Sequence, residues 1–215
     1  MKLKKYHKFL VAADGSAASG KTTGAKKIAR KFGLKFLSSG LLYRYASNQI
    51  IKNKPKNIVR FLNNRFKKIT YKFISKQNLH SEQISNHVAS LAKNRKVREI
   101  VNKFQKKIIK KNNKICVEGR DIASKILAKN PKYDLAFYFK CNVNIASVRR
   151  WQDIRKKIPL KEVKRSLLKR TLMDKTRKNS PLIKVKDAIL VRSDQLNKQQ
   201  VLNKMSKAID RALRN

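Results

Sequence analysis

One short segment near the start of the chain limits the possible folds more than any other feature. Residues 15–22 read Gly-Ser-Ala-Ala-Ser-Gly-Lys-Thr, which fits the pattern G-x-x-x-x-G-K-[ST] of a phosphate-binding loop. An apolar run over residues 9–13 precedes this segment, and a helix-like stretch over residues 23–32 follows it. The pattern therefore predicts a strand, a glycine-rich loop and a helix in that order, which is the context in which such a loop binds a nucleoside triphosphate.

The residue types in this loop each have a physical role. Glycines let the backbone approach phosphate oxygens, and successive N–H groups with the helix N-terminus form an anion site. Lys21 would reach the β- and γ-phosphates, and the Thr22 hydroxyl would be a ligand of Mg²⁺. The residues predicted to contact the triphosphate are Gly15, Ser16, Ala17, Ala18, Ser19, Gly20, Lys21, Thr22 and Thr23.

Length and composition narrow the class of protein further. A chain of 215 residues is one domain, or one core with inserted subdomains. We find no apolar run of about 20 residues that would predict a membrane-spanning helix, and the basic start of the chain does not read as a signal peptide. Cys116 and Cys141 sit inside apolar segments, which favours buried thiols and a cytoplasmic location.

The net charge of +44, from 56 basic and only 12 acidic residues, first suggests nucleic-acid binding. However, the lysines are spread along the whole chain, for example at Lys106-Lys107 and Lys110-Lys111, rather than gathered in one tail. We also recognise no helix-turn-helix and no RNA-binding signature. We therefore interpret the charge mainly as surface composition and predict neither an obligate nucleic-acid partner nor a membrane partner. A nucleic-acid-associated NTPase remains the alternative.

Apolar strands alternate with helical segments along the chain. The patterns predict strands over 8–14, 34–37, 69–75, 114–118, 134–140 and 187–192, and helices over 20–32, 41–52, 57–68, 81–94, 95–112, 143–175 with a break at Pro159, and 195–213. Apart from the alternating strand 69–75, five apolar strands alternate with helices. This is typical of an α/β fold with a doubly wound, five-stranded parallel sheet. Ligands of such sheets bind beyond the carboxyl ends of the strands, so the phosphate loop, residues 38–40 and residues 119–121 should converge on one cleft.

Arginine stands near these predicted strand ends in a chain whose basic residues are mostly lysine. Arg120 follows a buried strand, and Arg170, Asp174 and Arg177 have the spacing of one helical face. Arginine binds phosphate in a bidentate manner that lysine cannot match. Asp174 could stabilise the helix by pairing with these arginines, or it could bind a ribose diol between them, and the pattern alone leaves both readings open.

Taken in order, several blocks of the chain resemble the bacterial-type cytidylate kinases of the P-loop nucleoside monophosphate kinase superfamily. The resemblance covers essentially the full length, and the later blocks are more specific than the phosphate loop. The blocks are residues 14–23, Ser39-Gly40-Leu41-Leu42-Tyr43-Arg44, His87-Val88-Ala89-Ser90, Val97-Arg98-Glu99, Glu118-Gly119-Arg120-Asp121, and residues 170–182 with Asp174, Arg177 and Ser180-Pro181-Leu182 in register.

This resemblance implies a domain plan and a reaction. The core would be formed by about residues 8–40, 87–148 and 176–215, with a monophosphate-binding insertion over about 41–86 and a short helical lid over about 149–175. The implied activity is transfer of the ATP γ-phosphoryl group to CMP or dCMP, with ATP and Mg²⁺ as cofactors. The resemblance also favours a monomer.

The resemblance further implies a role for individual residues. The implied catalytic residues are Lys21, Arg44, Arg120 and Arg177, and the three arginines would hold the acceptor phosphate. Ser90, Arg98 and Asp121 would read the cytosine edge, and Ser39, Arg170 and Asp174 would contact the pentose. The lid arginines would be among Arg149, Arg150 and Arg155, of which Arg150 is the one predicted to contact ATP. Hydrogen-bond chemistry agrees with this for Asp121, because a carboxylate accepts from the N4 amino group of cytosine, which uracil lacks.

The chain also departs from the pattern of the family. Ser38 replaces the usual aspartate before Ser39, Ala123 replaces a common glycine, and Ala146 replaces an expected arginine. Residues 171–173 lack the usual acidic side chains, and the segment 53–86 is shortened and diverged. These departures concern nucleotide selectivity and the lid more than the class of reaction.

Overall fold

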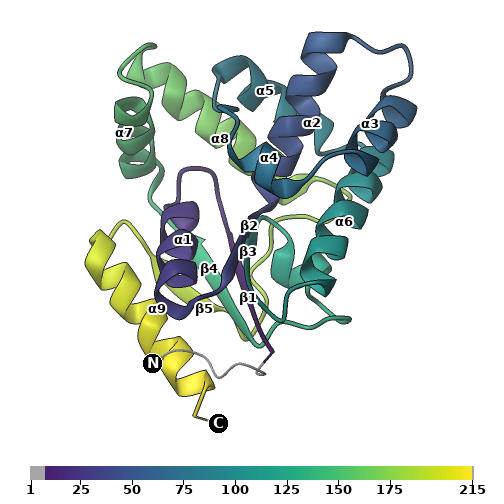
Figure 1. Cartoon of the computed structure of the whole chain (residues 1–215). Coiled ribbons are helices and arrows are strands. Elements are labelled where there is room, and N and C mark those ends of the chain that lie inside the picture. The colour runs from purple at the N-terminus through teal and green to yellow at the C-terminus, as the bar shows by residue number, and fades with distance from the viewer. Residues whose placement is uncertain (1–7, 215) are drawn as a thin grey trace. The chain divides into compact units, whose positions relative to one another are not determined.

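The structure is a computed structural model that describes residues 8–214, and it divides into two compact units. The inserted unit is Ser38–Lys111, and the core unit is formed by the described residues on either side of it, 8–37 and 112–214. Figure 1 shows the whole chain coloured from purple at the N-terminal end to yellow at the C-terminal end.

The core unit is built on a five-stranded sheet in the order β2-β3-β1-β4-β5. Its strands are β1 (Phe9–Gly15), β2 (Lys35–Ser38), β3 (Lys114–Gly119), β4 (Leu135–Lys140) and β5 (Ile189–Arg192). The central strand β1 pairs in parallel with β3 and β4, and β4 pairs in parallel with β5. The predicted doubly wound parallel sheet is thus confirmed.

The apolar residues of β1 are buried throughout its length, as expected for a strand covered on both faces. Helices α1 (Lys21–Phe32) and α9 (Lys198–Ala212) lie together on one of these faces (Figure 1). Their apolar sides meet alternate residues of β1, Phe9, Val11 and Ala13, in one hydrophobic cluster. This cluster fixes the axis of α1, and therefore the direction in which its N-terminus points.

Two further helices of the core unit, α7 (Val143–Asp153) and α8 (Leu160–Thr176), pack against each other. The predicted break is confirmed, because Pro159 is the N-cap residue of α8. Ala17 of the phosphate loop belongs to the same hydrophobic cluster as Ala146, Val163 and Leu167 of these helices. The helix pair is therefore anchored directly on the phosphate loop.

The inserted unit is helical throughout its described secondary structure. It contains α2 (Ser39–Asn53), α3 (Ile58–Lys67), α4 (Tyr71–Ser75), α5 (Glu82–Leu91) and α6 (Arg95–Lys110). A polar side chain caps the N-terminus of each helix: Ser38, Asn57, Thr70, Ser81 and Asn94 each accept a backbone N–H from the first turn. Local capping thus defines where these helices begin.

The strand predicted over residues 69–75 is wrong, because this segment contains helix α4. The Thr70 hydroxyl accepts the N–H of Phe73 at 3.3 Å and starts the helical turn. Ile74 is fully buried while Phe73 is 54% exposed, so burial does not follow the alternation of aromatic residues that suggested a strand. A short helix can place Tyr71 and Ile74 on the same side, which is the helical spacing of neighbours.

Among the described residues, none of the helices combines the length and the apolar character needed to cross a bilayer.

Candidate functional site

The phosphate loop lies between β1 and α1, as the sequence predicts. A side chain at Gly15 would come within 2.5 Å of the backbone oxygen of Phe139, so only glycine allows this close approach of β1 and β4. Gly20, the N-cap of α1, has a φ of 75°, which turns the chain into the helix. The loop is closed by hydrogen bonds from the Ser19 hydroxyl to the Ser16 oxygen at 2.9 Å and from the Ser193 hydroxyl to the Ser19 oxygen at 2.8 Å.

Lys21 begins α1 and is almost fully buried. Its Nζ donates to the backbone oxygen of Ser16 at 3.3 Å and lies 3.8 Å from Oε2 of Glu118. Burial is the main cause that lowers the pKa of Lys21 to about 7, and the Arg120 guanidinium lowers it further, whereas Glu118 acts in the opposite direction. The amino group of Lys21 is thus largely desolvated and held beside the loop.

The first turn of α1 also provides oxygen and N–H groups around the loop. Thr22 is half-buried directly after Lys21, and Thr23 is exposed. A hydroxyl at this position, beside a loop of backbone N–H groups and with the Glu118 carboxylate on the neighbouring strand end, is the hard-oxygen donor chemistry that Mg²⁺ prefers. The residues present therefore fit a magnesium ion bound with a nucleotide.

Beyond the carboxyl end of β3, the core unit brings together predicted residues that lie far apart in the chain. We call Arg120, Asp121, Asp174 and Arg177 the arginine–aspartate cluster. Arg120 Nε donates to Asp174 Oδ2 at 2.9 Å, and Arg177 Nη1 lies 3.4 Å from Asp174 Oδ1. Arg177 Nη2 lies 3.6 Å from Asp121 Oδ1. Both carboxylates therefore hold guanidinium groups in defined orientations.

Burial differs within the arginine–aspartate cluster. The side chains of Arg177 and Asp121 are only 5% and 6% exposed, whereas those of Arg120 and Asp174 are 19% and 17% exposed. Arg177 also donates from Nε to the backbone oxygen of Ser180 at 2.6 Å. The pair of Arg177 and Asp121 is therefore more deeply buried than the pair of Arg120 and Asp174.

One expectation about this region needs correction. Arg170, Asp174 and Arg177 do not share one helical face, because α8 ends at Thr176 and Arg177 has extended backbone. Arg177 still reaches Asp174, because it is the C-cap residue, three positions after Asp174. The chain then turns back, and the N–H of Leu182 donates to the Asp174 backbone oxygen at 2.7 Å. Arg170 is half-buried within α8. The ion-pairing reading of Asp174 is therefore observed.

Two acidic residues of the core unit belong to the site although the sequence reasoning assigned them no role. Glu118, the penultimate residue of β3, is buried beside Lys21. Asp14, in β1, is buried and accepts the N–H groups of Ile122 and Ala123 at 2.9 and 2.8 Å. The signal was present: each is an acid inside an apolar strand of a chain with only 12 acidic residues.

The inserted unit holds the other predicted acceptor-site residues. Ser39 is buried at the start of α2, and Ser90 is exposed on α5. Arg44 Nη1 donates at 3.0 Å both to the backbone oxygen of Leu79 and to the Ser85 hydroxyl. Arg98, 4% exposed, donates to the backbone oxygen of Ala92 at 3.2 Å. The two arginines are thus held in place by groups of the same unit.

The predicted lid arginines differ in their surroundings. Arg149 of α7 is exposed and donates from Nη2 to the backbone oxygen of Ser193 at 2.9 Å. Arg155 follows the helix with a positive φ of 54°. Within residues 8–214, the Nη2 atom of Arg150 is buried without a hydrogen-bond partner. A buried guanidinium N–H in this condition is costly unless a further group accepts from it.

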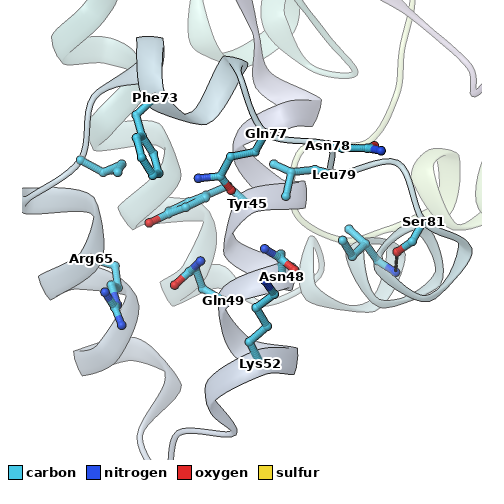
Figure 2. A pocket seen from close by; sticks show the side chains of 12 residues that line it. Tyr45, Asn48, Gln49, Lys52, Arg65, Phe73, Gln77, Asn78, Leu79 and Ser81 are labelled. Atoms are coloured by element: carbon cyan, nitrogen blue, oxygen red, sulfur yellow. Dashed lines mark hydrogen bonds between the residues drawn. The ribbon is translucent and has the colours of Figure 1, made fainter.

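A separate hollow of about 670 Å³ lies within the inserted unit (Figure 2). It is lined by residues of α2 to α5 and their connections, among them Tyr45, Gln49, Arg65, Phe73 and Gln77. Figure 2 shows their side chains around one space, with Phe73 on helix α4 and Arg65 on helix α3. None of the predicted site residues lines this hollow, so it is not the predicted nucleotide site.

These features together define a P-loop nucleotide-binding α/β fold of the kinase class. They are the strand, glycine loop and helix in order, the buried lysine, and the arginines beyond the strand ends. The shikimate kinase of Bacteroides thetaiotaomicron has the same fold, with a TM-score of 0.51 and 11% identity over 94% of this chain and 98% of that one.

The comparisons with known sequences are more specific than the fold. The family model described as cytidylate kinase matches residues 11–211. The cytidylate kinase of Mycoplasma capricolum is 33% identical over 91% of this chain and 93% of that protein, and that of Rickettsia akari is 30% identical over 94% and 91%. The chain therefore belongs to the cytidylate kinase family.

Proposed function

We propose that this protein transfers the γ-phosphoryl group of ATP to CMP, giving ADP and CDP, and that it also accepts dCMP. The observation that carries the proposal is the arginine–aspartate cluster beside Lys21. A phosphate loop alone would bind a triphosphate, whereas a second group of oriented guanidiniums suits a second phosphorylated substrate. Membership of the cytidylate kinase family supports CMP as that substrate.

On the donor side, the loop N–H groups and the N-terminus of α1 would hold the β- and γ-phosphates. Lys21 is already positioned by Ser16 and Glu118, and it would stabilise the negative charge that develops on the transferred group. Thr22 would hold Mg²⁺, which would supply positive charge to offset that of the phosphates. The low pKa of the free lysine, about 7, suits this role because an incoming polyphosphate restores its charge.

On the acceptor side, Arg44, Arg120 and Arg177 would bind the CMP phosphate. An oxygen of that phosphate attacks the γ-phosphorus, and the bond from this phosphorus to the β–γ bridging oxygen breaks, so ADP leaves with the electron pair. The attacking oxygen is already anionic, so no general base is needed. Catalysis then depends on in-line positioning and on lowering the repulsion between two polyanions.

Selectivity for cytosine would come from Ser90, Arg98 and Asp121, and the pentose would contact Ser39, Arg170 and Asp174. The Asp121 carboxylate accepts a hydrogen bond from the N4 amino group, while uracil would present an oxygen to it. Two oxygens facing each other without a proton cost binding energy, of the order of 1–3 kcal/mol. Discrimination against UMP follows from this mismatch.

Arg150 would complete the donor site from α7. Its buried Nη2 atom, which has no hydrogen-bond partner in the described part of the chain, would donate to ATP when the nucleotide is bound. The anchoring of α7 and α8 on Ala17 would transmit such contacts to the phosphate loop. Exclusion of water from the transferred group would limit hydrolysis of ATP.

We also propose a cytoplasmic monomer as the working form. Cys116 and Cys141 are both free thiols, and Cys116 is buried in the core sheet. Free thiols of this kind suit a reducing compartment.

The test measures the release of ADP with a coupled assay, in separate reactions that contain CMP, dCMP, UMP, AMP or no acceptor. We expect turnover with CMP and dCMP, little with UMP, and almost none without an acceptor. Because the net charge of +44 favours the alternative of a nucleic-acid-dependent NTPase, parallel reactions contain single-stranded RNA or DNA in place of CMP. Turnover that depends on nucleic acid, with none on CMP, would overturn the proposal.

A further inference from the structure

Asp14 is a buried carboxylate in the middle of the core unit. It is 2% exposed, it lies in the central strand β1 directly before Gly15, and it pairs in register with Gly119 at the end of β3. An acid in such a position loses its hydration, so its presence needs specific hydrogen bonds in return. Its carboxylate accepts from the backbone N–H groups of Ile122 and Ala123, at 2.9 and 2.8 Å.

These two N–H groups begin a short helical segment, η1 (Ile122–Ile126), which follows Arg120 and Asp121. The first N–H groups of a helix have no partner within the helix and are normally satisfied by the side chain of the N-cap residue. The N-cap residue here is Asp121, an amino acid well suited to capping, yet its side chain makes no cap hydrogen bond. Asp14 performs the capping from another strand.

Capping of η1 by Asp14 rather than by Asp121 has a consequence for the site. Because Asp14 satisfies the start of η1, the Asp121 carboxylate can turn to the arginine–aspartate cluster, where its Oδ1 lies 3.6 Å from Arg177 Nη2. Asp14 and Asp121 act on the same turn, because Asp14 accepts the N–H of Ile122 and Asp121 is the residue directly before Ile122. Without the carboxylate of Asp14, the unsatisfied N–H groups would draw Asp121 back into local capping.

We propose that Asp14 is a positioning residue of the acceptor site, which caps η1 in place of Asp121 and so keeps the Asp121 carboxylate beside Arg177, in the position from which it would meet the CMP base. This inference rests on the proposed function. The same carboxylate joins the phosphate loop to the turn that carries Arg120, because Asp14 is adjacent to Gly15 and bonded to Ile122 and Ala123. The hydrogen bonds of the Asp14 side chain therefore hold the turn on the acceptor side, next to Asp121.

The variant that tests the proposal is Asp14→Asn, which has the same shape but turns one acceptor oxygen into a donor. We expect the KM for CMP to rise about tenfold or more, because two hydrogen bonds to a charged group are lost or weakened. The preference for CMP over UMP should fall by about the same factor, while the KM for ATP changes by less than about threefold. If Asp14 had only a structural role, Asp14→Asn would lower stability without raising the KM for CMP more than the KM for ATP.

Asp134→Asn is the matched control. Asp134 Oδ2 accepts the backbone N–H of Leu10 at 2.7 Å, so it bonds to the same strand β1, but at the opposite end from the phosphate loop. This variant should lower the melting temperature while leaving the KM for CMP and the CMP-to-UMP preference within about twofold of the unchanged protein. An equal loss of CMP preference in both variants would overturn the proposal.

A double variant separates action through Asp121 from an independent effect. If Asp14 acts by releasing Asp121, then adding Asp14→Asn to Asp121→Ala should lower the CMP-to-UMP preference no further, whereas independent sites would multiply their effects. Multiplicative effects, or normal CMP kinetics in Asp14→Asn, would overturn the inference. If the unchanged protein itself fails to phosphorylate CMP, the proposed function fails first, and the two failures are therefore distinguishable.

Discussion

The core unit and the inserted unit hold their predicted phosphate-binding arginines in different ways. In the core unit, Arg120 and Arg177 are paired with the carboxylates of Asp174 and Asp121, which come from segments distant in the chain. In the inserted unit, Arg44 donates to the Leu79 backbone oxygen and the Ser85 hydroxyl, and Arg98 donates to the backbone oxygen of Ala92. Carboxylates thus contact the first pair, whereas backbone and hydroxyl oxygens are among the acceptors of the second.

The difference in acceptors predicts how strongly activity in each unit should respond to mutation of the partners of its arginines. A carboxylate is a stronger acceptor than a carbonyl or hydroxyl, and its loss leaves a partly buried cation without its counter-charge. A neutral acceptor contributes less, and its loss leaves the charge of the arginine unchanged. Changes to the partners in the core unit should therefore affect catalysis more than equivalent changes in the inserted unit.

The largest effect is expected from Lys21→Ala, at the donor end of the core unit. Removal of the desolvated cation should lower kcat by about 10²–10³, as for other groups that stabilise developing charge. The rate of ADP formation with saturating ATP and CMP measures this. Lys26→Ala, on an exposed position of the same helix α1, is the control and should stay within about twofold.

Next in size, Asp174→Asn should raise the KM for CMP about tenfold, because Arg120 and Arg177 both lose a charged partner and their common orientation. Steady-state kinetics with CMP varied at saturating ATP gives the value. The neighbouring exposed Lys175→Ala serves as control on α8. If Asp174→Asn had no more effect than this control, the contrast between the two units would be lost.

A smaller effect is expected from Ser85→Ala in the inserted unit. Arg44 keeps the Leu79 oxygen and loses one neutral acceptor, so the KM for CMP should rise about two- to fivefold, with stability reduced by about 1 kcal/mol. Denaturant unfolding and CMP kinetics on the same preparation measure both. Ser75→Ala is the control, since its hydroxyl donates only within α4, to Lys72, at an exposed site. A loss as large as that of Asp174→Asn would contradict the contrast.

The last prediction concerns stability rather than catalysis. Burial raises the pKa of Asp14 to about 7, from an ordinary value of 3.8, against the opposing hydrogen bonds from Ile122 and Ala123. The folded chain therefore binds this proton more tightly than the unfolded chain. The contribution of Asp14 to the free energy of unfolding falls as the pH rises from about 4 to about 7, and it is constant above that range.

Unfolding by urea at several pH values checks this prediction. The stability of the unchanged chain minus that of Asp14→Asn should decline over the interval from about pH 4 to about pH 7, because asparagine does not titrate. A difference that rises over this interval would show that the hydrogen bonds outweigh burial. That result would place Asp14 with the charge-stabilised carboxylates of the core unit.

Most of the core unit could be predicted from the sequence, and the inserted unit less well. Buried parallel strands are continuous apolar runs, and glycine positions in the phosphate loop are demanded by close backbone approach, so both leave strong local signals. In the inserted unit, Ile69, Tyr71 and Phe73 alternate like a strand, but Thr70 caps a helix and Ile74 is the buried residue. Short segments of this kind are decided by packing rather than by their own periodicity.

Within the site, residue types were predictable and their partners were not. Lys21, Arg120 and Asp174 stand in recognisable motifs, yet the pairing of Arg120 with Asp174 joins residues 54 positions apart. The spacing of Asp174 and Arg177 predicted a pair that is observed, but it did not predict that α8 ends before Arg177. Local spacing describes a helix, but it does not say where the helix ends.

By itself, the sequence determined a phosphate loop between a strand and a helix, a parallel α/β core and the family to which the chain belongs, because these depend on local patterns and ordered motifs. Only the tertiary structure decided that Asp14 caps η1 in place of Asp121, that Glu118 lies beside Lys21, and that Asp174 holds two arginines. Most of these relations join segments that are distant in the chain, so no local pattern encodes them.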